Sequence, residues 1–270
     1  MDKRKINNRP VGIFDSGMGG LTVFNAVADN IPGENIVYFG DTAHLPYGSK
    51  SKETVIEYAK KALIFFTRCK VKCMVVACNT ASVYALDTIK EYAAFPIIGV
   101  VQPGVNAASR TNAKSIGIIG TYGTIKSMTY QQKLKQKNSE IKLLAKSCPL
   151  FVPLVEEGWI EHEVTRKVAR IYLDTLKNKI QVLILGCTHY PLLKNIISDT
   201  VGKKVKVIDS AQAVSKKVKR ILQNYSLLNP QPEKTVNYRF YVSDAPELFA
   251  ERGSIFLDKS IENVQKIEVV

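Results

Sequence analysis

The chain has 270 residues, of which 46% are hydrophobic and 23% charged, a composition that suits one large domain or two lobes of a globular protein. No run approaches the ~18 apolar residues of a membrane-spanning helix, and the basic residues 1–10 lead into no apolar stretch typical of a signal peptide. We therefore expect a cytoplasmic protein with no membrane partner. The net charge of +14 also suits a nucleic-acid-binding protein, but the scattered lysines accompany no nucleic-acid-binding motif and favour a solvated surface that attracts a small anion.

Short apolar, β-branched runs alternate along the chain with amphipathic stretches of helix length. The runs predict strands over 11–15, 35–41, 73–78, 96–100, 115–121, 142–148, 182–187 and 205–209. The stretches between them predict helices over 20–30, 52–69, 80–93, 124–137, 156–177, 192–201 and 211–225. Runs such as 74–77 and 182–185 are apolar on both faces, as in a parallel sheet covered by helices on both sides. The alternation predicts an α/β fold.

Two short motifs recur and suggest an ancient duplication. Residues 78–80, Cys-Asn-Thr, are echoed by residues 187–189, Cys-Thr-His, and residues 14–17, Phe-Asp-Ser-Gly, by residues 208–211, Ile-Asp-Ser-Ala. We predict two similar lobes, each a mostly parallel sheet flanked by helices, with the active site in the cleft between them.

The predicted lobe boundaries follow from where the chain crosses the cleft. Residues 99–104 form the predicted crossover, and the chain is expected to return to the first lobe near Asp209, with residues 237–242 completing that lobe. Lobe one is then 1–99 plus 209–270, and lobe two is 100–208.

The five cysteines are too few and too irregularly spaced for a disulfide framework. Cys69, Cys73 and Cys78 lie close together but lack the paired spacing of zinc sites, so we expect no metal. Thiols that stay reduced can be chemically active.

Cys78 and Cys187 occupy equivalent positions, each directly after a predicted buried strand and before a helix. Asn79 or Thr80 is expected to cap the helix after Cys78, and the positive helix end should then lower the pKa of that thiol. His189 is two residues after Cys187 and should reach the same cleft. Inverting a stereocentre requires removing a proton from one face and returning one to the other, which two opposed thiols can do by general acid–base chemistry.

Three acidic residues near these motifs also have candidate roles. Asp15 precedes a glycine-rich stretch whose backbone N–H groups can approach an anion, and its carboxylate suits a ligand's α-ammonium group or can assist a thiol. Glu156 and Glu157 are expected to open the helix predicted over 156–177, where acidic side chains complement the helix dipole.

Several of these segments resemble bacterial glutamate racemases. They are residues 14–22, 40–43, 46–48, 77–82, 119–121 with 124, 155–158 and 186–191, and the resemblance runs from about Val11 to about Gly253. It implies interconversion of L- and D-glutamate, with D-glutamate supplied for peptidoglycan and hence for the cell wall and cell shape. It also implies that neither pyridoxal phosphate nor a metal is used. His44 and Lys50 depart from the family, which often has arginine there.

Carried over motif by motif, the resemblance assigns roles to individual side chains. Cys78 and Cys187 are the proton donors and acceptors, Asp15 supports Cys78, and His189 and Glu156 support Cys187. The residues that bind substrate are Asp15, Ser16, Tyr47, Gly48, Asn79, Thr80, Thr121, Thr124, Thr188 and His189.

Three alternatives remain open at this point. A racemase of another acidic amino acid such as aspartate would carry the same kinds of motif. A hydrolase with a Cys187–His189 nucleophile leaves Cys78 without a role, and a basic nucleic-acid-binding protein would show salt-dependent affinity for DNA. The sequence also leaves a homodimer open.

Overall fold

The computed structural model describes residues 7–229 and 236–269, so residues 1–6 of the basic N-terminal segment lie outside the described part. The described residues form two parallel sheets, sheet A in the order β10-β9-β2-β1-β3-β4 and sheet B in the order β6-β5-β7-β8. The strands of sheet A are β1 (Val11–Asp15), β2 (Ile36–Gly40), β3 (Cys73–Val76), β4 (Ile97–Gly99), β9 (Tyr238–Val242) and β10 (Val264–Lys266). Those of sheet B are β5 (Ser115–Gly120), β6 (Lys142–Ser147), β7 (Val182–Gly186) and β8 (Lys206–Asp209).

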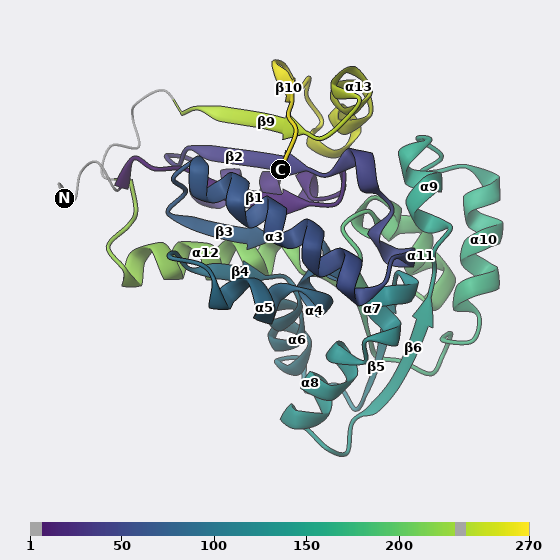
Figure 1. Ribbon diagram of the computed structural model, residues 1–270. Helices are drawn as coiled ribbons and strands as arrows, with labels where there is room; N and C mark the ends of the chain where they lie inside the picture. The colour runs from purple at the N-terminus through teal and green to yellow at the C-terminus, as the bar shows by residue number, and fades with distance from the viewer. Residues whose placement is uncertain (1–6, 230–235, 270) are drawn as a thin grey trace.

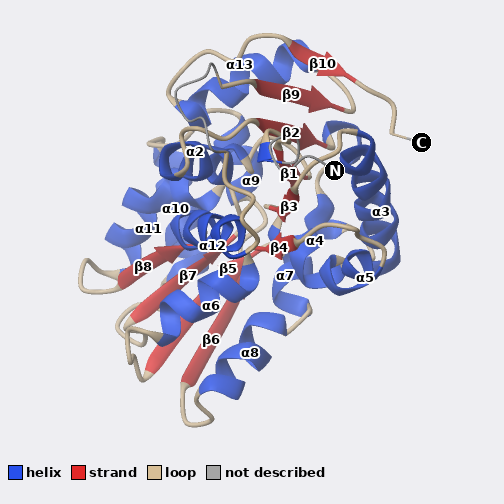
Figure 2. Ribbon diagram, turned by 90° about the vertical axis from the view of Figure 1, so that its left-hand side faces the viewer, coloured by secondary structure: helices blue, strands red, loops and turns tan. Residues whose placement is uncertain are grey.

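Helices cover both faces of each sheet (Figures 1 and 2). Around sheet A lie α2 (Leu21–Asn30), α3 (Lys52–Arg68), α4 (Asn79–Tyr84), α5 (Leu86–Glu91), α12 (Ala211–Asn224) and α13 (Pro246–Leu257). Around sheet B lie α6 (Val101–Ser109), α7 (Tyr122–Lys126), α8 (Thr129–Lys137), α9 (Phe151–Glu156), α10 (Glu163–Leu173) and α11 (Lys194–Val201). Figure 2 shows α3, α4 and α5 on one side of sheet A and α2 and α12 on the other.

The central strands are buried because their residues are apolar on both faces. Every residue of β1, β2, β3 and β7 is buried, whereas every residue of β6, at the edge of sheet B, is exposed or half-buried. Parallel pairing places Asp15 beside Gly40 and Gly120 beside Gly186, which brings the carboxyl ends of the strands to a common edge in each sheet. The predicted two-lobed α/β fold is confirmed.

Three predicted helices differ from the structure. The helix predicted over 80–93 is divided at Ala85 into α4 and α5, and the one over 124–137 is divided at Met128, whose φ of 57° is left-handed. The prediction that Glu156 opens a helix is wrong, because Glu156 is the last residue of α9. Gly158 then adopts a φ of 73°, which ends that helix, and α10 begins only at Glu163.

Two elements near the C-terminus, α13 and β10, were not predicted from the sequence. The strand predicted near 237–242 is β9, and it joins sheet A beside β2. β10 then adds to the edge beyond β9, and α13 lies between them in the chain. Within the described ranges, no helix is both long and apolar enough to cross a membrane.

Candidate active site

A small cavity lies where the carboxyl ends of the strands of both sheets meet. Its volume is about 30 Å³, which is room for about one water molecule. Residues that follow β1, β2 and β3 of sheet A and β5 and β7 of sheet B line it together. A cavity of this size holds no amino acid, so a substrate enters only when the lining opens.

Most of the residues predicted to bind or react with substrate line this cavity. They are Ser16, Tyr47, Gly48, Cys78, Asn79, Thr80, Thr121, Glu156, Cys187, Thr188 and His189. Asp15 and Thr124 are fully buried and lie behind the lining. Gly17, Leu45, Pro46 and Val152 also line it. Pro46 belongs to a segment quoted in the resemblance, whereas Val152 on α9 had no signal in the sequence.

Cys78 follows β3 and itself caps α4. Its Sγ accepts a hydrogen bond from the backbone N–H of Ala81 at 3.5 Å, so the expectation that Asn79 or Thr80 is the cap is wrong. The expected direction of the pKa is also wrong. Burial, reinforced by the charge of Asp15, raises the pKa of Cys78 to about 12, and the Ala81 N–H and the Ser16 hydroxyl lower it by less. At neutral pH Cys78 is therefore a thiol that can donate a proton.

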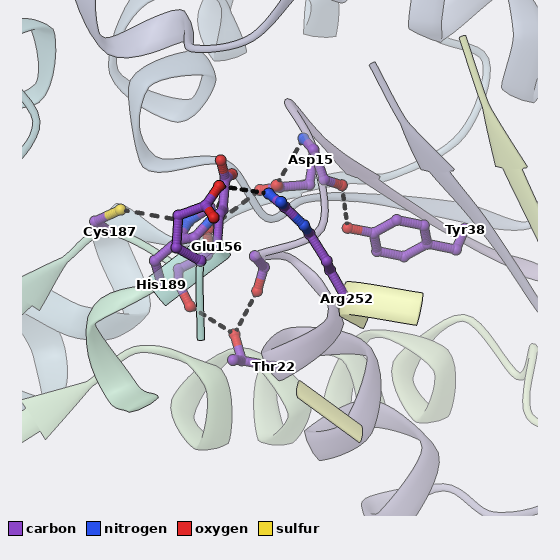
Figure 3. A network of polar contacts seen from close by, with 11 residues as sticks. Asp15, Thr22, Tyr38, Glu156, Cys187, His189 and Arg252 are labelled. Carbon is purple, nitrogen blue, oxygen red and sulfur yellow. Dashed lines mark hydrogen bonds and ion pairs between the residues drawn. The ribbon is translucent and has the colours of Figure 1, made fainter. Parts of the chain in front are cut away.

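Cys187 lies at the end of a chain of three polar side chains (Figure 3). Its Sγ is 3.9 Å from Nδ1 of His189, whose Nε2 is 3.0 Å from Oε1 of Glu156. Burial lowers the pKa of His189, but the contacts with Cys187 and Glu156 outweigh burial and raise that pKa to about 10. His189 is thus protonated at neutral pH and can share its charge with both neighbours.

Asp15 lies beneath the glycine-rich loop that follows β1. Its Oδ2 accepts a hydrogen bond from the Gly17 N–H at 3.0 Å, and its Oδ1 accepts one from the Thr188 hydroxyl at 3.5 Å. Burial raises the pKa of Asp15, and the nearby charge of His189 lowers it by less. The Tyr38 hydroxyl donates to the carbonyl of Gly17 at 2.8 Å and fixes the same loop from below (Figure 3).

Three threonine hydroxyls form a triangle across the junction of the two sheets. The Oγ1 atoms of Thr80 and Thr121 are 2.9 Å apart, those of Thr121 and Thr124 are 3.0 Å apart, and those of Thr80 and Thr124 are 3.3 Å apart. Thr121 also caps α7. Gly48 approaches so closely that a Cβ there would lie 2.6 Å from Cβ of Thr121. Such hydroxyls can donate to a carboxylate when one enters.

The loop after β2 is anchored by Asp41. Its carboxylate accepts hydrogen bonds from the Tyr47 hydroxyl at 2.5 Å and the Ser243 hydroxyl at 2.7 Å, and it contacts Nδ1 of His44 at 2.8 Å. The His44 ring stacks on Tyr58, with centroids 4.3 Å apart. His44, one of the departures from the family, therefore supports the loop that brings Tyr47 and Gly48 to the cavity.

Helix α13 contacts the Cys187 side of the cavity, which sequence reasoning missed because this helix was not predicted. Arg252, labelled in Figure 3, pairs with Glu157 at 3.0 Å. The Phe256 ring meets His189 edge-on, with centroids 5.5 Å apart. Trp159, three residues after Glu156, is 44% exposed, and its ring packs against His162.

Comparison with known proteins identifies the family of this chain. Residues 22–218 match the sequence profile described as Asp/Glu/Hydantoin racemase. The chain belongs to this family. It is 43% identical over 263 residues to a glutamate racemase of Geobacter metallireducens, a match that covers 97% of each chain. The predicted resemblance is confirmed.

Solved structures of the family share the whole architecture. A glutamate racemase from Francisella tularensis in complex with D-glutamate matches with a TM-score of 0.92 and 38% identity, over 97% of this chain and 98% of that one. A glutamate racemase from Thermus thermophilus in complex with beta-chloro-D-alanine matches with a TM-score of 0.89 and 40% identity, over the same shares. A Picrophilus torridus aspartate racemase, at 16% identity and a TM-score of 0.59 over 82% of this chain and 99% of that one, shares the fold.

Proposed function

We propose that the protein interconverts L- and D-glutamate by proton transfer between two thiols and Cα, without a cofactor. The observation that carries this proposal is that Cys78 and Cys187, from the ends of strands in different sheets, line one cavity. Full-length relatives named glutamate racemase support glutamate as the substrate.

The reaction balances with the two thiols alone. One cysteine, as the thiolate, takes the proton from Cα, and the electron pair of the broken C–H bond remains on Cα and spreads into the adjacent carboxylate. The opposite cysteine, as the thiol, then gives its proton to the other face of Cα and becomes the thiolate. One proton leaves and one returns, so nothing is oxidised or reduced and no group departs.

We assign Cys187 to deprotonation of L-glutamate and Cys78 to deprotonation of D-glutamate. This assignment rests on the resemblance to glutamate racemases. In the direction from L- to D-glutamate, Cys78 then donates its proton as a neutral thiol, the form that its raised pKa favours. Asp15, whose pKa burial also raises, is assigned to support of Cys78, and His189 with Glu156 to support of Cys187.

Substrate binding is assigned to the polar groups around the two thiols. The hydroxyls of Ser16, Thr80, Thr121 and Thr188 and the amide of Asn79 suit the two carboxylates, since each can donate a hydrogen bond. The other assigned residues are Asp15, Tyr47, Gly48, Thr124 and His189. The net charge of +14 favours the approach of a small anion at low salt.

The proposals on pathway, location, partners and lobe boundaries rest on the resemblance to glutamate racemases and on which strands form each sheet. We propose that the D-glutamate serves peptidoglycan synthesis in the cytoplasm, that no specific nucleic acid is a partner, and that a homodimer is compatible with this activity. Lobe one, as 1–99 plus 209–270, and lobe two, as 100–208, agree with a sheet A built from β1–β4, β9 and β10 and a sheet B built from β5–β8.

The test is a chiral assay of the purified protein on a panel of amino acids that includes aspartate. The panel is run with chelator present and without added pyridoxal phosphate. We expect glutamate to be racemised from either enantiomer. Turnover that requires a metal or pyridoxal phosphate would contradict the two-thiol proposal. A preference for aspartate would contradict the proposal that glutamate is the substrate.

A further inference from the structure

The side-chain amide of Asn79 is only half satisfied in the closed cavity. Asn79 lies at the start of α4, is 3% exposed and lines the cavity. Its Oδ1 accepts a hydrogen bond from the Tyr130 hydroxyl at 2.8 Å, whereas its buried Nδ2 has no partner among the residues that the structure describes. A buried donor left unpaired costs free energy, and an incoming acceptor would recover it.

Tyr130 comes to Asn79 from the other side of the cleft. It lies on α8, between β5 and β6 of sheet B, and it is fully buried. A Cβ on Gly186 would lie 3.5 Å from its ring, so the residue before Cys187 packs directly against it. Burial raises the pKa of Tyr130, so its hydroxyl stays protonated and donates to the amide oxygen. No role was predicted for Tyr130 from the sequence.

We propose that Tyr130 is a positioning residue that aims the Asn79 amide at the substrate. By holding Oδ1, the tyrosine leaves Nδ2 as the group that donates to a carboxylate of the bound amino acid. This inference rests on the proposed function, since it requires an amino-acid substrate with a carboxylate beside Asn79.

Removing the Tyr130 hydroxyl tests the proposal. In Tyr130→Phe the amide loses its fixed orientation, and we expect KM for both L- and D-glutamate to rise about tenfold, the scale of one hydrogen bond to a charged group. The kcat should change much less, because the lost contact is made equally in the ground state and the transition state. The value of kcat/KM must fall by the same factor in both directions, since the free enantiomers are equal in energy.

Tyr190→Phe is the matched control. Tyr190 is also fully buried, and its hydroxyl donates to the backbone carbonyl of Cys148 at 2.8 Å. The Tyr190→Phe protein should lose about as much stability as Tyr130→Phe, as measured by thermal or denaturant unfolding. Its KM should stay at the wild-type value. Equal effects of the two variants on KM, or loss of the fold in Tyr130→Phe alone, would assign Tyr130 a purely structural role and overturn the proposal.

A double-mutant cycle with Asn79→Ala separates action through Asn79 from action by another route. If Tyr130 works through the amide, Tyr130→Phe adds nothing to the raised KM of Asn79→Ala. Multiplied effects would overturn the proposal. A wild-type protein that turns over aspartate instead of glutamate would overturn the proposed substrate, and the cycle run on aspartate would still decide the role of Tyr130.

Discussion

The two ends of the cavity hold the same reactive group in different surroundings. Cys78 shares its environment with the Asp15 carboxylate, and burial with that charge raises its pKa to about 12. Cys187 instead lies 3.9 Å from Nδ1 of His189, a side chain that is protonated at neutral pH. A reaction with mirror-image products of equal energy therefore does not require a symmetric site. The asymmetry means that the two thiols face different charges, the Asp15 carboxylate at the Cys78 end and the His189 imidazolium at the Cys187 end.

The largest expected effect comes from removing either thiol. Cys78→Ala and Cys187→Ala should each lower kcat by about 10³ in both directions, since each removes the acid or base from one face of Cα. Racemisation is measured by chiral chromatography or polarimetry. Cys73→Ala is the control, because Cys73 is also fully buried and its pKa is also raised to about 12, yet it lies at the start of β3.

The same pair of variants distinguishes the two-thiol account from a single nucleophile. If Cys187 and His189 acted alone, Cys78→Ala would behave like Cys73→Ala. A folded Cys78→Ala protein with activity near wild type would contradict the two-thiol account.

A smaller loss of activity is expected from a substitution that crowds the Cys187 end of the cavity but replaces none of its reactive groups. In Gly19→Ala the new Cβ would lie 2.4 Å from Nδ1 of His189 and 2.4 Å from Oγ1 of Thr188, so both side chains must move. Moving His189 and Thr188 out of position should lower kcat/KM by about 10². Gly104→Ala is the control, since its Cβ would have nothing closer than 3.6 Å. Unchanged activity in Gly19→Ala would show that the position of His189 does not matter.

Weakening the support of His189 should shift the pH dependence. In Glu156→Gln the His189 pKa falls from about 10, because one of the two contacts that raise it loses its charge. We expect about a tenfold loss of kcat/KM, with the decline at alkaline pH moving to lower pH. Glu157→Gln, the adjacent and more exposed glutamate, is the control.

The same variant makes a signed prediction for stability. The folded-state pKa of His189 lies above its ordinary 6.5, so protonation stabilises the fold fully below about pH 6.5. This contribution is lost as pH rises through about 10. In Glu156→Gln the contribution should be smaller and its loss complete at a lower pH, because only the folded-state pKa changes; both are measured from the free energy of unfolding in denaturant across this range. Identical pH dependence in the two proteins would contradict the role given to Glu156.

The smallest effect is expected at the contact between α13 and the Glu157 side chain. Arg252→Ala removes an ion pair whose side chains are 30% and 57% exposed. Solvent screens such a pair, so the free energy of unfolding should fall by at most about 1 kcal/mol, with little change in kcat. A larger loss of activity than in Glu156→Gln would show that α13 governs the Cys187 end more strongly than the His189–Glu156 contact does.

The sheet was more predictable than the helices. The strand predicted over 11–15 has the bounds of β1, because residues apolar on both faces between polar ends fit little else. The long helix predicted over 156–177 was wrong because the left-handed turn at Gly158 interrupts an otherwise helical pattern. The division at Met128 was equally hidden, since methionine rarely adopts a left-handed φ.

The site was predictable where a residue follows a strand and hidden where it reaches across the cleft. Cys78, Cys187 and His189 were named from their positions after strands and line the cavity as expected. Tyr130 and Phe256 come from helices remote in sequence, and only the packing of the two sheets brings them to the site. The pKa of Cys78 was predicted in the wrong direction, because the helix end was visible in the sequence and the degree of burial was not.

The most direct test of the two-thiol account is the fate of the Cα proton in D₂O. Wild-type protein is given L-glutamate or D-glutamate in separate reactions, and both enantiomers are recovered early for mass spectrometry or NMR. We predict deuterium at Cα in the product enantiomer from the first turnover and in both directions, with the remaining substrate unlabelled, because the thiol that returns a proton is not the one that removed it. Product that keeps its original protium, or substrate that gains deuterium as fast as product forms, would contradict two opposed thiols and point to a single base.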